Sequence, residues 1–88
     1  GQAAEAPLRA TALVNIELRA GPAVLARLRS LPGVQVVHTT SGRFDLLVQI
    51  AAQTTQELDE TLDRIGEARG VKGSESLIHL STKLDRRG

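Results

Sequence analysis

Apolar residues recur with two different periods along this chain of 88 residues. The order in which segments of each period follow one another constrains the fold more than any other feature. A period of two predicts a strand, and a period near 3.6 predicts a helix. Strand patterns cover Thr11–Leu18, Val34–Thr40, Phe44–Ala51 and Val71–Thr82. Helical patterns separate the first strand from the second and the third from the fourth. The predicted order of elements is therefore β-α-β-β-α-β.

Turn and capping residues indicate where the two helices begin and end. Gly21-Pro22 opens the first helix, because proline in a first turn loses no hydrogen bond, and Pro32-Gly33 ends it. Thr54 and Glu57 form a capping-box pattern at the start of the second helix. Gly70 is the expected C-terminal cap of that helix.

The connection Ser41-Gly42-Arg43 is so short that the strands beside it must form an antiparallel hairpin. The whole order matches the ferredoxin-like plan, an α+β fold with a four-stranded antiparallel sheet and two helices on one face. We expect residues 1–10 to be a linker or tail, residues 11–83 to be the domain, and residues 84–88 to be a charged tail.

One face of the predicted sheet is left uncovered by helices, and it is not uniformly polar. Apolar residues from all the strands fall on it, namely Leu13, Val37, Leu47 and Leu77. An apolar centre with a polar rim is typical of a protein interface, although scattered apolar surface residues are also common. A domain of this size gains stability by oligomerising. We therefore interpret these residues as a dimer interface, so that two copies pair through their sheets.

The composition argues against several classes of function. There is no Cys, which excludes disulfides and thiolate metal sites. No apolar run approaches the roughly 18 residues of a membrane span. The net charge is +1 and the only aromatic residue is Phe44, which argues against nucleic-acid binding by a basic patch or by base stacking. We expect a cytoplasmic protein without membrane contact.

Residue arrangements that are typical of catalysis are also missing. His38 and His79 have no carboxylate at metal-ligand spacing, and we interpret each as a strand histidine with one hydrogen-bonded nitrogen. The acidic residues of the second helix match a solvated helix face. We therefore expect no catalytic residue, no metal site and no cofactor.

The hairpin from Thr39 to Asp45 is the segment that most suggests a ligand. Gly42 lets a ligand approach backbone N–H groups, which can hold a carboxylate, and Asp45 can hold an ammonium. An amino acid carries both charges. An ordinary turn with a solvated Asp45 is the alternative. If the ligand hypothesis holds, the variant Asp45→Ala should fold normally and bind poorly.

At these segments the chain resembles the effector domain of the Lrp/AsnC transcription regulators. The resemblance spans about Thr11 to Lys83 and is most specific at the Gly-x-x-Asp pattern of the hairpin. The segments that carry it are Leu31–Val34, Thr39–Val48, Gly70-Val71 and Ser74–Thr82.

The resemblance implies a ferredoxin-like dimer, often assembled into larger homo-oligomers, that binds amino acids or related metabolites between dimers and near the hairpin. It implies ligand contacts at Gly42, Asp45, Ser74 and Ser76, although many relatives carry threonine at the last two positions. Thr40 and Arg43 of the same hairpin are further candidate ligand residues. Relatives usually bind DNA through an N-terminal helix-turn-helix domain. We expect either a segment that begins at the linker after such a domain or a stand-alone effector domain.

Two other functions stay open. One is a stand-alone ferredoxin-like dimer that binds no ligand. The other is a small dimeric enzyme similar to antibiotic monooxygenases or muconolactone isomerases. Such an enzyme would need a sheet-lined pocket with aromatic or histidine side chains, and a single aromatic residue argues against it.

Overall fold

The computed structural model describes residues 7–87 and confirms the predicted ferredoxin-like order of elements. The strands are β1 (Leu8–Ile16), β2 (Val34–Thr39), β3 (Leu46–Ala52) and β4 (Val71–Ile78). The helices are α1 (Gly21–Arg29) and α2 (Thr55–Glu67). The sheet has the order β2-β3-β1-β4, and all neighbouring strands are antiparallel. Among the described residues, no helix is long and apolar enough to cross a membrane.

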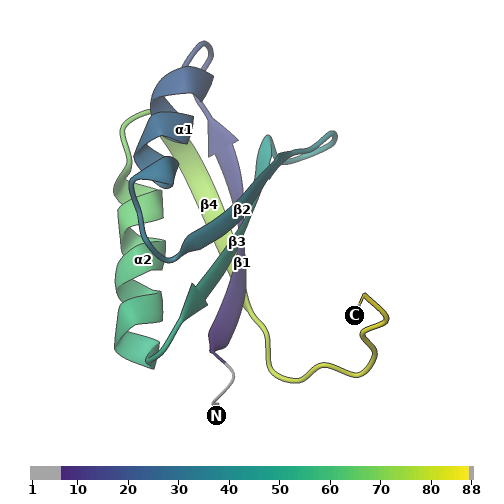
Figure 1. Cartoon of the computed structure of the whole chain (residues 1–88). Helices are drawn as coiled ribbons and strands as arrows, with labels where there is room; N and C mark the ends of the chain where they lie inside the picture. Colours follow the sequence, from purple (N-terminus) through teal and green to yellow (C-terminus); the bar gives the residue numbers. More distant parts are fainter. Residues whose placement is uncertain (1–6, 88) are drawn as a thin grey trace.

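Both helices cover one face of the sheet and leave the other face open (Figure 1). The core lies between the helices and the central strands β1 and β3, whose alternate side chains point inward. Its most deeply buried members are Ala10, Ala12, Val14, Val24, Leu28, Val48, Ile50 and Ile65. This alternation matches the predicted period of two in both central strands.

The start of α2 has the predicted Thr54 cap, while Glu57 reaches one residue further back than in the predicted capping box. The side-chain oxygen of Thr54 accepts a hydrogen bond from the backbone N–H of Glu57 at 3.1 Å. The Glu57 carboxylate in turn accepts one from the backbone N–H of Gln53 at 3.0 Å. Two backbone donors that the helix itself cannot satisfy therefore find partners in neighbouring side chains.

β1 begins at Leu8, three residues before the start that the sequence predicts at Thr11. The segment Leu8–Ala10, assigned to the linker by sequence, belongs to the sheet and pairs with the end of β3. Leu18, the last residue of the predicted strand, lies outside β1 and is 89% exposed. The chain leaves the sheet after Ile16 and turns at Arg19, whose φ is +67°, so the strand alternation no longer applies there.

A bulge in β2 reverses the faces that the sequence predicts for this strand. Val34 pairs with Ile50 but Val36 pairs with the adjacent Gln49, so β2 has one extra residue at this point. Val37 consequently packs against the core, while Val36 takes its place on the open face. The prediction that Val37 lies on the open face is wrong, because one inserted residue shifts the alternation of every side chain after it.

Two glycines give opposite predictions for stability. Gly66 lies inside α2, and a Cβ there would lie 3.5 Å from the Ser74 hydroxyl oxygen, which is an ordinary contact. We expect Gly66→Ala to raise the free energy of unfolding by about 0.5–1 kcal/mol, because alanine loses less backbone entropy in a helix. Urea denaturation measures this difference.

The matched control is Gly33→Ala. A Cβ on Gly33 would lie 2.9 Å from the Thr61 hydroxyl oxygen and 3.2 Å from the carbonyl oxygen of Ala51, so this variant should be less stable than the parent. A Gly66→Ala variant that is less stable than the parent would contradict this prediction, because it would show that α2 has no room for a methyl group at position 66.

Candidate functional site

The open face of the sheet presents apolar side chains in two adjacent rows across the strands. One row contains His38, Leu47, Leu13 and Glu75, and the next contains Val36, Gln49, Thr11 and Leu77. We name Leu13, Val36, Leu47 and Leu77 the apolar quartet. Leu13 and Leu47 are half-buried, while Val36 and Leu77 are 43% and 54% exposed. Leu13, Leu47 and Leu77 therefore lie on the open face, as the sequence predicts, while Val36 lies there in place of Val37.

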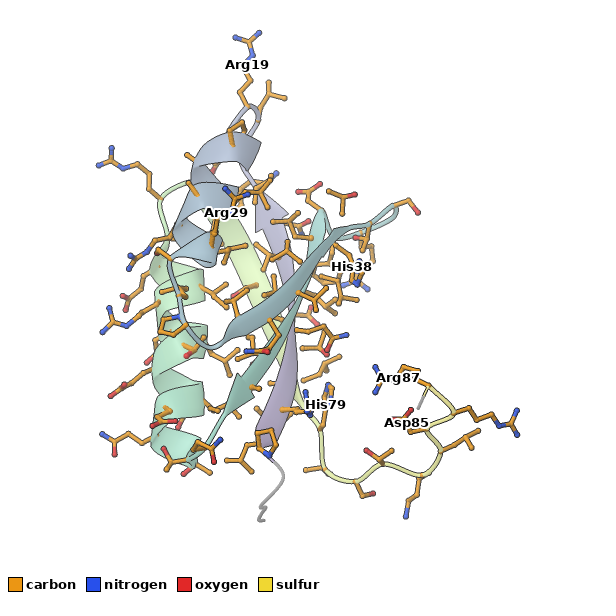
Figure 2. All side chains as sticks on the ribbon, viewed as in Figure 1. Arg19, Arg29, His38, His79, Asp85 and Arg87 are labelled. Carbon is orange, nitrogen blue, oxygen red and sulfur yellow. The ribbon has the colours of Figure 1, made fainter. Side chains whose placement is uncertain are left out.

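A polar cluster lies among these apolar residues. The Thr11 hydroxyl oxygen lies 2.8 Å from His79 Nε2, and it donates a hydrogen bond of 3.4 Å to the Gln49 side-chain oxygen. Thr11 is only 9% exposed, which makes it the most buried residue of the open face. Figure 2 shows His38 and His79 on the side of the sheet opposite the helices. His79 has the hydrogen-bonded ring nitrogen that the sequence predicts, but it is not a strand residue, because β4 ends at Ile78.

The hairpin between β2 and β3 is closed by its own hydrogen bonds. The Thr40 hydroxyl donates to the carbonyl oxygen of Phe44 at 2.6 Å, and the Thr40 backbone N–H donates to that of Asp45 at 3.0 Å. Gly42 has a φ of +96°, and a Cβ there would meet no atom within 4 Å. Glycine is therefore needed at this position for its backbone angle and not to make space.

Asp45 has a structural role that the sequence analysis missed. One of its carboxylate oxygens accepts a hydrogen bond from the backbone N–H of Ile16 at 2.9 Å, and its own N–H donates to the carbonyl of Val14 at 2.9 Å. Ile16 is the residue at which the pairing of β1 with β4 shifts register. The carboxylate thus satisfies a donor at an irregular point of the sheet, and an undisturbed fold is no longer expected for Asp45→Ala.

Arg43 links the hairpin to β4. Its guanidinium lies 3.8 Å from a carboxylate oxygen of Glu75 and 5.4 Å from the centroid of the Phe44 ring. Exposed ion pairs of this kind contribute little stability, but this one shows that the hairpin reaches the row of the open face that holds Glu75. Strand alternation alone places Glu75, between Ser74 and Ser76, on the opposite face from both serines.

Ser74 and Ser76 lie on the helix-covered side of β4. They pair with Val14 and Ala12, whose side chains are buried in the core. Together with residues of α2, including Gly66, they line a hollow of about 320 Å³. Arg43 instead contacts Glu75 on the open face, and Asp45 bonds to Ile16 at the end of β1. A single chain therefore does not bring the predicted ligand residues of the hairpin and of β4 into one site.

Comparison with known proteins decides the family. Residues 11–88 match the model of the Lrp/AsnC ligand binding domain. The chain belongs to this family. It is 34% identical over 61 residues to the HTH-type transcriptional regulator LysM of Saccharolobus solfataricus, covering 69% of this chain and 43% of that protein. It is 33% identical over 73 residues to the regulator FL11 of Pyrococcus horikoshii, covering 81% and 48%.

This Lrp/AsnC domain spans about half the length of the curated regulators that it matches. It is also 31% identical over 71 residues to a homocitrate synthase of Sulfurisphaera tokodaii, of which it covers only 15%. Among solved structures, Escherichia coli AsnC superposes with a TM-score of 0.80 at 18% identity, covering 98% of this chain and 64% of that one. A complex of a Neisseria meningitidis transcriptional regulator with L-Met gives 0.79 at 23% identity, covering 91% and 54%.

The geometry at Asp45 predicts different effects for two substitutions. Asp45→Ala should lower the free energy of unfolding by about 1 kcal/mol, because the Ile16 N–H loses its acceptor at a position that water can reach. Asp45→Asn keeps an oxygen acceptor and should stay near the parent. Urea denaturation of both variants, with Asp59→Asn on the exposed face of α2 as a control, measures the difference. Equal stability of the parent and Asp45→Ala would show that this hydrogen bond contributes nothing.

Proposed function

We propose that this chain is the effector-binding and oligomerisation domain of an Lrp/AsnC-like transcription regulator and that it acts without catalysis. The observation that carries the proposal is the family match over residues 11–88. The curated regulators LysM and FL11 support it, because each matches more than two thirds of this chain. In this proposal DNA binding belongs to a helix-turn-helix domain outside these 88 residues, and the protein acts in the cytoplasm.

The proposal includes a homodimer formed by packing the open faces of two sheets. Within residues 7–87 both helices cover the other face, so no helix covers the apolar quartet (Figure 1). Burial of these side chains against a second copy is favourable in proportion to the apolar area removed from water. Thr11 and His79 already bond to each other, so their contact can be buried without leaving both groups unpaired. Larger homo-oligomers would be built from such dimers.

The proposed effector is an amino acid or a related metabolite bound at the hairpin. The L-Met complex of the Neisseria regulator supports this ligand class. Backbone N–H groups near Gly42 and the exposed guanidinium of Arg43 suit the carboxylate of such a ligand, and the Asp45 carboxylate suits its ammonium. Ser74 and Ser76 lie on the other face of the sheet, so in this proposal they reach the ligand from a neighbouring subunit.

A second candidate is a regulatory domain joined to an enzyme. It is favoured by the homocitrate synthase match, in which this domain corresponds to a small part of a much longer chain. The coding sequence on either side of residues 1–88 separates the candidates, since one predicts a helix-turn-helix segment and the other an enzyme domain. A dimer that binds no ligand and a monooxygenase-like enzyme remain the weaker alternatives, because neither explains the family match.

Leu47→Lys should weaken the dimer at least tenfold, because packing two sheets would bury a charge without a partner. Analytical ultracentrifugation across a dilution series measures the dissociation constant. Leu18→Lys is the matched control, because Leu18 is already 89% exposed and lies outside the sheet. A parent chain that sediments as a monomer at micromolar concentration would contradict the proposed dimer.

Asp45→Asn should bind the effector about ten- to a hundredfold more weakly, since a hydrogen bond to a charged group contributes about 1.5–3 kcal/mol. A thermal-shift screen of the standard amino acids first identifies a ligand, and calorimetry then compares the parent with this variant. The asparagine substitution preserves the acceptor for Ile16, so any loss reports on the ligand and not on the fold. If no amino acid shifts the parent, the proposed effector class is wrong.

A further inference from the structure

A cleft of about 600 Å³ opens at the end of the sheet that is opposite the hairpin. It lies between the loop that joins α1 to β2 and the first turns of α2, with Pro7 beside it at the start of β1. The apolar part of its lining comes from Pro7, Leu31, Pro32, Ala51 and Ala52. A mostly apolar concavity of this size with a few convergent polar groups is the usual form of a small-molecule site.

Hydrogen bonds hold the two sides of this cleft in place. The carbonyl oxygen of Gly33 accepts from the Ala51 N–H at 2.9 Å, which ties the α1–β2 loop to the end of β3. The Thr61 hydroxyl donates to the carbonyl of Glu57 at 3.0 Å, which fixes its position on α2. Gly33 permits the loop and the helix to approach closely, since a Cβ there would lie 2.9 Å from the Thr61 oxygen. The cleft is thus formed before any ligand arrives.

Two opposite charges line the cleft without neutralising each other. Glu60 and Arg64 are one helical turn apart on α2, the spacing at which such side chains commonly pair. Among residues 7–87, neither of them takes part in an ion pair. Glu57 differs, because its carboxylate already accepts the Gln53 N–H. The cleft therefore presents one available carboxylate and one available guanidinium beside an apolar lining.

We propose that this cleft is a second ligand site, which takes a small apolar zwitterion of the amino-acid type. The guanidinium of Arg64 binds the ligand carboxylate, the carboxylate of Glu60 binds its ammonium, and the apolar side chain packs against Leu31 and Ala52. Charge-assisted hydrogen bonds of this kind are among the strongest that a protein surface offers to a small ligand. The site goes beyond the proposed hairpin site and does not depend on it.

The two sites are well separated in space. The hairpin adjoins Leu46 and the cleft adjoins Ala52, at opposite ends of β3, so they lie about 20 Å apart at roughly 3.3 Å per strand residue. The cleft is bordered by α2 and the α1–β2 loop and not by the apolar quartet. Pairing of two copies through the apolar quartet therefore uses none of the residues that line the cleft. An occupant would also contact Pro7, where the chain enters β1.

Amide NMR spectra of the full chain, titrated in turn with L-alanine, L-valine, L-leucine, L-isoleucine, L-methionine and L-phenylalanine, test the second site. We expect at least one of these amino acids to shift the backbone amides of Gly33, Ala51 and Thr61 in a saturable way. The amine and the carboxylic acid that correspond to that amino acid, each lacking one charge, should bind at least tenfold more weakly. If none of the six moves these amides, the second site does not exist.

Variants then separate this site from the hairpin site. Glu60→Gln and Arg64→Gln should each weaken binding at the cleft about tenfold, while Asp59→Asn on the same helix should leave it unchanged. Asp45→Asn should leave the cleft shifts intact and abolish only those at residues 40–45. Shifts confined to residues 40–45 would overturn the second site and leave the proposed function standing. Cleft shifts that persist in both glutamine variants would also overturn it.

Discussion

The pairing of β1 with β3 is the interaction on which the rest of this domain depends. Its register runs unbroken from Leu8 opposite Ala52 to Val14 opposite Leu46. That register directs one set of side chains under the helices and the alternate set, including the Leu13 and Leu47 pair, toward the open face. Because a slip by one residue would exchange the two faces, both the core and the proposed dimer surface rest on this one alignment.

Polar side chains add hydrogen bonds to those of the strand pairing. The Asp45 carboxylate accepts the Ile16 N–H beside a register shift, and the Thr11 hydroxyl lies between Gln49 and His79 on the open face. Figure 2 shows a further short-range pair, Asp85 with Arg87, in the C-terminal tail beyond β4. Asp45, which suggests a ligand contact in the sequence, therefore also stabilises the fold. A substitution that tests ligand binding at Asp45 must keep its hydrogen bond to Ile16.

The arrangement of the candidate residues has a consequence for assembly. Arg43 reaches across to Glu75, whereas Ser74 and Ser76 on either side of it point toward α2. One subunit thus contributes the hairpin to one surface and the serines to another. A ligand that touches both sets requires at least two subunits, so effector binding and oligomerisation would be linked in this proposal, because each stabilises the state that the other prefers.

The sequence by itself determined the order of elements, the capping box at Thr54, the turn at Gly42 and the alternation in β1 and β3. These are local features, governed by backbone sterics and by the burial of alternate side chains within a few residues. Only the tertiary structure decided that Leu8 joins the sheet, that a bulge turns Val37 into the core, that Asp45 bonds to Ile16, and that Glu60 and Arg64 border a cleft. Each of these depends on a partner strand or helix far along the chain, and the strength of such a contact cannot be inferred from the neighbouring residues alone.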